Sequence, residues 1–135
     1  AGDEILKLFA VVIASNLRLS DLSGRIGGEE FAALLPCSLE EGVIVADRMR
    51  QVFENSNIVC EEGPVDTTVS IGVAGGPAGT ELEVLLAAAD TALYQAKRGG
   101  RNRVEAAEEL PLSLENWRRK SAGIAVVERA KPATA

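Results

Sequence analysis

The glycine pair Gly27-Gly28 separates two short segments that both have the composition of β-strands. Residues 20–26 precede the pair and residues 30–35 follow it, and Pro36 ends the second segment because proline cannot donate a hydrogen bond to a sheet. Glycine adopts the backbone angles that a tight turn requires. The sequence therefore predicts a hairpin over residues 20–35.

Three other segments repeat apolar residues with the period of an amphipathic helix. They cover residues 2–17, 38–55 and 80–98. Ser38, with Glu41 three residues later, has the spacing of a capping box at the start of the second helix. Thr80 can cap the third helix, and Gly99-Gly100 stops it.

Two more strands complete the predicted fold. Apolar and polar residues alternate over 65–73, which predicts a half-buried strand, and a last short strand is expected over 102–106. Residues 61–64 and 75–79 read as loops because they are polar or rich in glycine and proline. The order helix, strand, strand, helix, strand, helix, strand predicts an α+β fold, an α/β sandwich with a mostly antiparallel sheet.

The bulk composition is that of one soluble globular domain, with 135 residues, 47% of them hydrophobic and 25% charged. The net charge of -6 argues against a broad nucleic-acid-binding surface. The chain has no histidine, which removes the usual general base and the commonest transition-metal ligand. Cys37 and Cys60 lack the spacing of a metal site, and we interpret them as reduced residues of a cytosolic protein.

The residues around the glycine pair are of types that bind phosphate and a metal ion. Glu29 and Glu30 offer hard oxygen ligands, suited to a divalent cation that carries a nucleoside triphosphate. Without a cation, the repulsion between two adjacent carboxylates is mildly unfavourable. Arg18 offers a planar fork of donors to a phosphate or a guanine edge, and Asp21 completes an Arg-x-x-Asp pair. These patterns predict a phosphate and metal site with a second anion site nearby.

Four segments, in the right order, carry a resemblance to one family. Residues 25–31 contain Gly-Gly-Glu-Glu-Phe, residues 66–73 read Asp-Thr-Thr-Val-Ser-Ile-Gly-Val, and residues 89–102 end in Lys-Arg-Gly-Gly-Arg-Asn. The fourth is the Arg-x-x-Asp pair, with five residues between it and the glycines. Over about residues 2–107 the chain resembles GGDEF domains, the diguanylate cyclases, and the segments match the family's signature loop, late strand, last helix and inhibitory product site.

The resemblance implies a domain like the palm of nucleotide cyclases and polymerases, which condenses two GTP molecules into cyclic di-GMP and pyrophosphate. Each domain of a homodimer presents one GTP, and each 3′-hydroxyl attacks the other's α-phosphate. The implied cofactor is Mg²⁺ (or Mn²⁺), held by the catalytic residues Glu29 and Glu30, of which Glu29 also helps to activate the hydroxyl. Such chemistry relies on positioning and charge neutralisation, so it does not require histidine.

The resemblance also implies substrate contacts, each with an ordinary structural alternative. Gly27 and Gly28 would let the hairpin backbone lie against GTP, or would only form a turn. Asp3 matches an aspartate that hydrogen-bonds guanine, and its alternative is a carboxylate at a helix N-terminus. Lys97 and Arg101 match basic residues that contact the triphosphate, and their alternative is a pair of cations at a helix C-terminus.

The implied product site consists of Arg18, Asp21 and Arg48, which would bind cyclic di-GMP as a feedback inhibitor. The alternatives are a surface ion pair of little energetic value and a solvated helix arginine. Two other functions therefore stay open. One is a cyclic di-GMP receptor that makes no product, and the other is a dimerisation module that binds no nucleotide.

The resemblance begins late in the family's pattern. A family domain has about one more strand and helix before Gly2, and that strand, which lies in the middle of the sheet, carries a metal-binding aspartate. We therefore expect a GGDEF domain over residues 1–107 without its first strand, with open sheet edges that invite pairing with another chain. Residues 108–135 are expected to form a partly disordered tail, in which Leu110, Leu112, Leu114 and Trp117 can dock a short segment onto the core.

Several expectations concern the parent protein rather than these residues. The chain alone should make little cyclic di-GMP, so that receptor-like binding is its expected behaviour. The parent is expected in the bacterial cytoplasm, with an upstream sensory domain and an upstream segment that can anchor it to a membrane. Cyclic di-GMP is two-fold symmetric, so a ligand-bridged homodimer is an expected assembly.

Overall fold

A computed structural model describes residues 2–17, 22–27, 30–56, 58–60, 63–65, 68–77, 79–108 and 121–129. Its helices are α1 (Gly2–Ser15), α2 (Leu39–Glu54) and α3 (Leu82–Arg98). Its strands are β1 (Leu22–Gly27), β2 (Glu30–Leu35), β3 (Ile58–Cys60), β4 (Gly63–Val65), β5 (Val69–Pro77), β6 (Val104–Ala106) and β7 (Ser121–Arg129). The predicted α+β class is confirmed.

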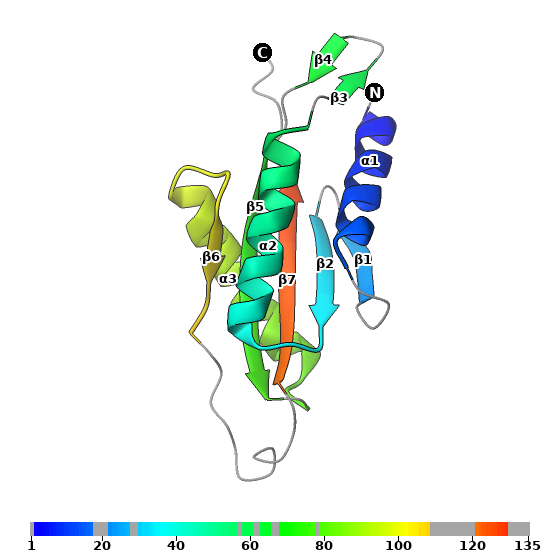
Figure 1. Ribbon diagram of the computed structural model, residues 1–135. Helices are drawn as coiled ribbons and strands as arrows, with labels where there is room; N and C mark the ends of the chain where they lie inside the picture. Colours follow the sequence, from blue (N-terminus) through cyan, green and yellow to red (C-terminus); the bar gives the residue numbers. More distant parts are fainter. Residues whose placement is uncertain are drawn as a thin grey trace.

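Five of these strands form one sheet in the order β1-β2-β7-β5-β6, with α2 and α3 on opposite faces (Figure 1). All neighbouring pairs are antiparallel except β5 and β6, which are parallel. The mostly antiparallel sheet is therefore confirmed. Residues 61–64, predicted as a loop, are in part strand, because Gly63–Val65 pairs with Ile58–Cys60 in a separate two-stranded ribbon.

Strand β7 corrects the expectation for the C-terminal part of the chain. Ser121–Arg129 lies between β2 and β5 and pairs with both, instead of belonging to a tail. It fills the middle of the sheet, where the family resemblance puts the missing first strand. The two inner sheet edges that were expected to be open are therefore paired within this chain, which satisfies their backbone hydrogen-bonding groups.

The core explains why this segment is a central strand. Ala125 and Val127 join the cluster under α1 and α2, while Ile124 and Val126 join the cluster under α3. All four side chains are at most 2% exposed. A continuous apolar run suits a strand that is covered on both faces, so residues 124–127 favour the middle of the sheet over an edge.

Strand β5 is also covered on both faces, which corrects the prediction of a half-buried strand and of a loop that starts at residue 75. All nine residues of β5, through Pro77, are buried. At Gly72 an added Cβ would collide with the backbone of Ala89 and Leu93 in α3. Glycine is therefore required there because the helix lies directly on the strand.

The helix boundaries follow local capping. Ser38 accepts a hydrogen bond from the backbone amide of Glu41 at 3.2 Å, as the capping pattern predicts for α2. The N-cap of α3 is Glu81, one residue after the predicted cap Thr80, and the helix begins at Leu82. The hydroxyl of Thr80 donates instead to the carbonyl of Pro77 at 2.6 Å. The α3 helix ends at Arg98, before the two glycines, as predicted.

Candidate functional site

The predicted site lies where the hairpin of β1 and β2 turns. Gly27 ends β1 with a φ of 155°, and its Cα position is open, so the backbone angle rather than space favours glycine there. The pairing register shifts between Arg25 and Gly27, which is a bulge next to the turn. Gly28 and Glu29 lie outside the described residues, and Glu30 begins β2 immediately after them.

Glu30 is part of a charged group that three elements build. In the sheet register Glu30 of β2 is the direct partner of Glu128 of β7. The ammonium of Lys97, in the last turn of α3, lies 2.5 Å from Oε2 of Glu128. The side chains of Lys97 and Glu128 are only 27% and 20% exposed. The structure thus brings two of the predicted residues, Glu30 and Lys97, to one carboxylate.

The electrostatics of this group are those of a carboxylate pair with one cation. A hydrogen bond with Glu128 raises the pKa of Glu30, and burial and the negative charges of Glu128 and Asp90 raise it further. The positive charge of Lys97 acts in the opposite direction. The group therefore carries excess negative charge next to the predicted phosphate site, and a proton or a metal cation would relieve the repulsion between its carboxylates.

Oxygen donors of this kind fit Mg²⁺ or Mn²⁺ in chemical type. Within the described ranges, no three side chains of His, Cys, Asp or Glu gather closely enough to form a metal centre. The second predicted ligand, Glu29, lies outside those ranges. Glu30 is therefore the described member of the predicted metal pair.

Arg101 lies in the turn that follows α3, and its side chain is exposed. Arg101 and Asn102 both have positive φ, at 64° and 44°. Arg50 donates a hydrogen bond to Oδ1 of Asn102 at 3.1 Å, and the amide of Asn102 donates to Glu54, so α2 holds this turn in place. The described contacts of Arg101 are local, through its amide to Ala96 and through its carbonyl to Arg103.

The product-site residues fall in part outside the described chain. Arg18 and Asp21 belong to the residues that are not described, so their predicted role is not tested. Arg48 is exposed on α2, and its guanidinium donates to Oδ1 and to the carbonyl of Asn16 at 3.2 and 3.1 Å. It is thus tied to the end of α1, two residues before Arg18, instead of being only solvated. Asp3 lies in the first turn of α1, where its backbone is described and its side chain is not.

Glu128 is the residue that sequence reasoning missed. Its only signal is its place directly after the apolar run 124–127, and that run was assigned to a tail. Beside it in the register lies Ser70 of β5, which is 1% exposed and whose hydroxyl has no hydrogen-bond partner in the described part of the chain. Glu30, Glu128 and Ser70 therefore form a row across three neighbouring strands, on the face that α3 covers.

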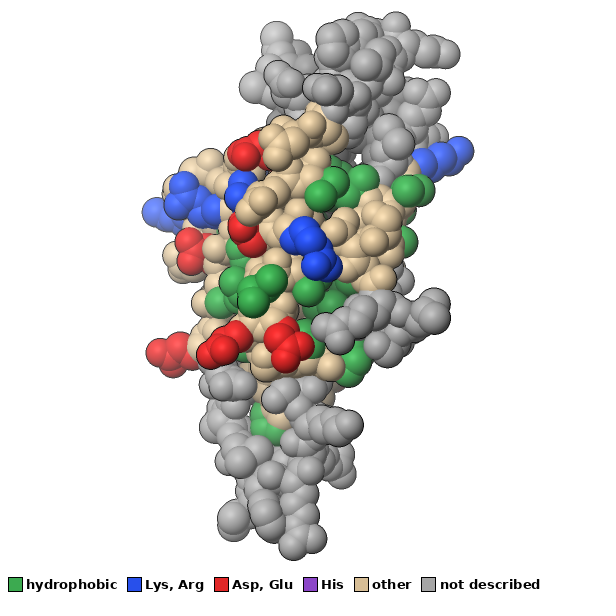
Figure 2. Space-filling view, in the orientation of Figure 1, with side chains coloured by type: hydrophobic (Ala, Val, Ile, Leu, Met, Phe, Trp, Pro, Cys, Tyr) green, Lys and Arg blue, Asp and Glu red, His purple; other side chains and the backbone are tan. Residues whose placement is uncertain are grey.

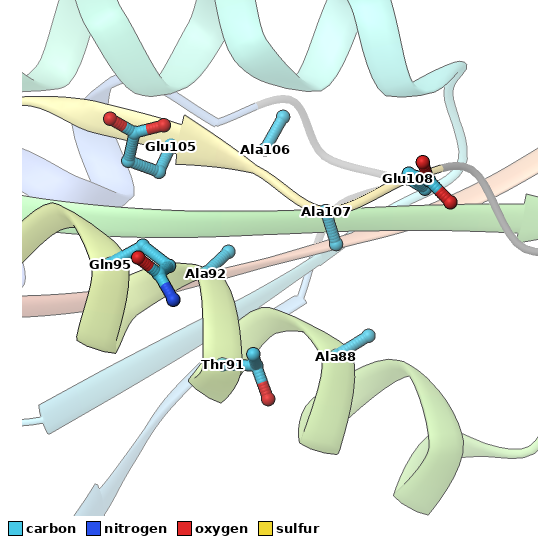
Figure 3. Close-up of a pocket in the computed structure, with 8 residues that line it drawn as sticks. All are labelled: Ala88, Thr91, Ala92, Gln95, Glu105, Ala106, Ala107 and Glu108. Carbon is cyan, nitrogen blue, oxygen red and sulfur yellow. The ribbon is translucent and has the colours of Figure 1, made fainter.

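A separate pocket of about 320 Å³ lies between α3 and the edge strand β6. Small side chains of α3 and β6 line it, together with Thr91, Gln95, Glu105 and Glu108 (Figure 3). It lies beyond β5, away from the hairpin. Among the described residues that line it, none is a predicted site residue.

The surface on the α2 side mixes basic, acidic and hydrophobic side chains, without one extended basic area among its coloured residues (Figure 2). Over the ranges that the structure describes, none of the helices is long and apolar enough to cross a membrane.

The chain belongs to the family described as diguanylate cyclase, GGDEF domain, whose model matches residues 1–103. It is 42% identical to the response regulator PleD of Caulobacter vibrioides over 107 residues, which are 76% of this chain and 24% of PleD. It is 39% identical to the diguanylate cyclase DgcP of Pseudomonas aeruginosa over 108 residues, 79% of this chain and 16% of DgcP. The chain thus spans less than a third of the length of these relatives.

Solved structures agree with the sequence comparison. The GGDEF domain of DgcB from Caulobacter crescentus, in complex with c-di-GMP, superposes with a TM-score of 0.73 and 32% identity, over 79% of this chain and 65% of that chain. The diguanylate cyclase SiaD of Pseudomonas aeruginosa, in complex with its activator SiaC, superposes with a TM-score of 0.72 and 36% identity. The match covers 78% of this chain and 41% of the SiaD chain. The fold of the described chain is therefore that of a GGDEF domain.

Proposed function

We propose that this domain acts in a diguanylate cyclase that condenses two GTP molecules into cyclic di-GMP. Family membership supports cyclic di-GMP synthesis as the general activity. The observation that carries the proposal for this chain is the convergence of Glu30 and Lys97 at the end of the hairpin, through Glu128. A carboxylate that can hold a cation and an ammonium that can contact phosphate are then available to one triphosphate.

In the proposed reaction the 3′ oxygen of each GTP bonds to the α-phosphorus of the other. At each α-phosphorus the bond to the β-phosphate breaks, so the two bonds that close the ring release two pyrophosphates. Glu29 takes the proton of the attacking hydroxyl. Glu29 and Glu30 hold Mg²⁺ or Mn²⁺, which when bound neutralises the charge of the triphosphate. Lys97 and Arg101 contact the phosphates, Gly27 and Gly28 give the backbone close access, and Asp3 accepts from guanine N1 and N2.

The reaction joins two nucleotides on two domains, so a homodimer is part of the proposal. We also infer product inhibition at Arg18, Asp21 and Arg48. The hydrogen bonds of Arg48 to Asn16 support this, because they hold its guanidinium at the segment that leads to Arg18. Arginine forks match phosphate and the O6 and N7 edge of guanine, while aspartate accepts from N1 and N2.

The test is incubation of the chain with GTP and Mg²⁺, with chromatographic measurement of cyclic di-GMP and pyrophosphate. We expect Glu30→Gln to lower any synthesis at least about 100-fold, as loss of a group that stabilises transition-state charge does, and the matched change Glu105→Gln on β6 to leave it unaltered. A low rate for the 135-residue chain alone stays a prediction, which this assay also tests.

Calorimetric titration of cyclic di-GMP into the chain and its Arg18→Ala variant tests the product site. Binding that the variant loses would support feedback inhibition, and binding without any synthesis would favour the receptor alternative. A chain that neither binds GTP or cyclic di-GMP nor makes product would contradict both.

A further inference from the structure

Glu128 contacts two residues to which the proposed function gives roles. It is the cross-strand partner of Glu30, and its Oε2 lies 2.5 Å from the ammonium of Lys97. These three residues come from β2, α3 and β7, which meet only in the folded chain. Glu128 is therefore the group through which the predicted cation ligand and the predicted phosphate contact are connected.

The setting distinguishes this arrangement from an ordinary surface ion pair. Exposed pairs contribute little because their long side chains are mobile and solvated. Here both partners are mostly covered, at 27% and 20% exposure, and the sheet register fixes the backbone of Glu128. Lys97 in turn lies in the last turn of α3, which packs on β5 and β7.

The row of side chains is also not arranged for stability alone. Glu30 and Glu128 lie directly opposite each other on neighbouring strands. Two like charges in such positions destabilise a sheet. On the other side of Glu128 lies the buried hydroxyl of Ser70, which lacks a hydrogen-bond partner among the described residues. A buried polar group without a partner costs free energy, and such groups call for an explanation beyond packing.

We propose that Glu128 is a positioning residue of the nucleotide site, whose carboxylate holds the ammonium of Lys97 beside Glu30. The cation ligand and the phosphate contact then face the same triphosphate in a fixed geometry. This inference rests on the proposed roles of Glu30 and Lys97. It adds to the site a residue from β7, a strand that lies outside the matched residues 1–103.

The test is binding of a fluorescent GTP analogue with Mg²⁺, which requires no turnover, to the full chain and four variants. These are Glu128→Gln, Lys97→Ala, the double variant, and Glu105→Gln as a control for loss of a carboxylate on another strand. We expect Glu128→Gln to weaken binding about 10-fold, as loss of a supporting contact commonly does. The control should bind like the wild type, and the double variant no more weakly than Lys97→Ala alone.

Glu128→Asp keeps the charge but withdraws the carboxylate by one methylene group, and we expect an affinity between those of wild type and Glu128→Gln. If Glu128→Gln does not fold, which circular dichroism would show, Glu128→Asp replaces it in the binding test. Unchanged affinity in either folded variant would overturn the positioning role. An equal loss with and without Lys97 would overturn it too, because it would show a structural effect only. Wild-type protein that binds no analogue would instead overturn the proposed function, and this inference with it.

Discussion

Strands β2 and β7 are neighbours in the sheet, yet local sequence signals predict β2 and do not predict β7. β2 follows a glycine turn and ends before a proline, so its place in a hairpin is evident locally. β7 has no turn partner, and its pairing partners β2 and β5 begin at residues 30 and 69. The comparison shows that a local motif can predict a strand and its candidate site residues, whereas a strand that pairs only with distant segments carries no motif of its own.

The largest expected effect comes from a charge buried in β7, which tests whether this strand is part of the core. We expect Val127→Asp, at a position that is 0% exposed, to cost at least about 4 kcal/mol of unfolding free energy, because the core offers that charge no partner. Urea denaturation followed by circular dichroism measures the cost. Ile26→Asp, at a β1 position that is 46% exposed, is the matched control and should change stability little. If Val127→Asp matched its control, residues 121–129 would be a dispensable tail after all.

A smaller effect on stability is expected from alanine substitutions at two strand glycines, one in the covered strand β5 and one in β1. Gly72→Ala places a methyl group against the backbone of α3, next to β7, and we expect a loss of about 3 kcal/mol. Gly24→Ala in β1 meets no atom within 4 Å, so it should shift stability by less than about 0.5 kcal/mol. Thermal unfolding of the two variants compares them directly. Equal melting temperatures would show that α3 does not lie on β5 as described.

The smallest expected effect on stability comes from changing Glu30, which faces Glu128 across β2 and β7. The pKa of Glu30 is raised in the folded chain, so the folded state binds its proton more tightly than the unfolded state does. The stabilisation from this proton is complete below the ordinary pKa of glutamate and is lost as the pH rises through the raised value. We therefore expect Glu30→Gln to gain less than about 1 kcal/mol near neutral pH, and to lose this advantage in acid.

Urea midpoints measured from pH 3 to pH 8 check the prediction for Glu30→Gln. Glu105→Gln serves again as the control for removal of one negative charge. A Glu30→Gln variant that is less stable than the wild type at pH 7, while Glu105→Gln is neutral, would show that Glu30 is held as a carboxylate.

Local patterns predicted those parts of the fold that local interactions determine. The hairpin at Gly27, the capped start of α2 at Ser38 and the end of α3 before Gly99 all depend on residues close in sequence. The errors arose where distant elements decide. Strand β5 was expected to be half-buried because alternation cannot reveal that α3 covers its second face, and β7 was missed because its pairing depends on strands far away.

The same division applies to the site. Sequence reasoning selected Glu30 and Lys97, and the structure brings them together, but only through Glu128, which no motif indicated. Arg48 is predicted from the family resemblance. Its anchoring to Asn16 does not follow from the sequence, because Arg48 lies on α2 and Asn16 lies in the turn after α1. Motifs predict candidate residues, whereas the contacts that orient those residues depend on the tertiary structure.

The central position of β7 also has a consequence for the order of events during synthesis. A ribosome releases β2, β5 and β6 before β7 exists, so the two inner strands must wait for a partner while about fifty residues after β5 are still being made. Strands β2 and β5 therefore have no central neighbour until residues 121–129 have been made. Because β7 pairs with strands that are distant in sequence, we expect this pairing to slow folding.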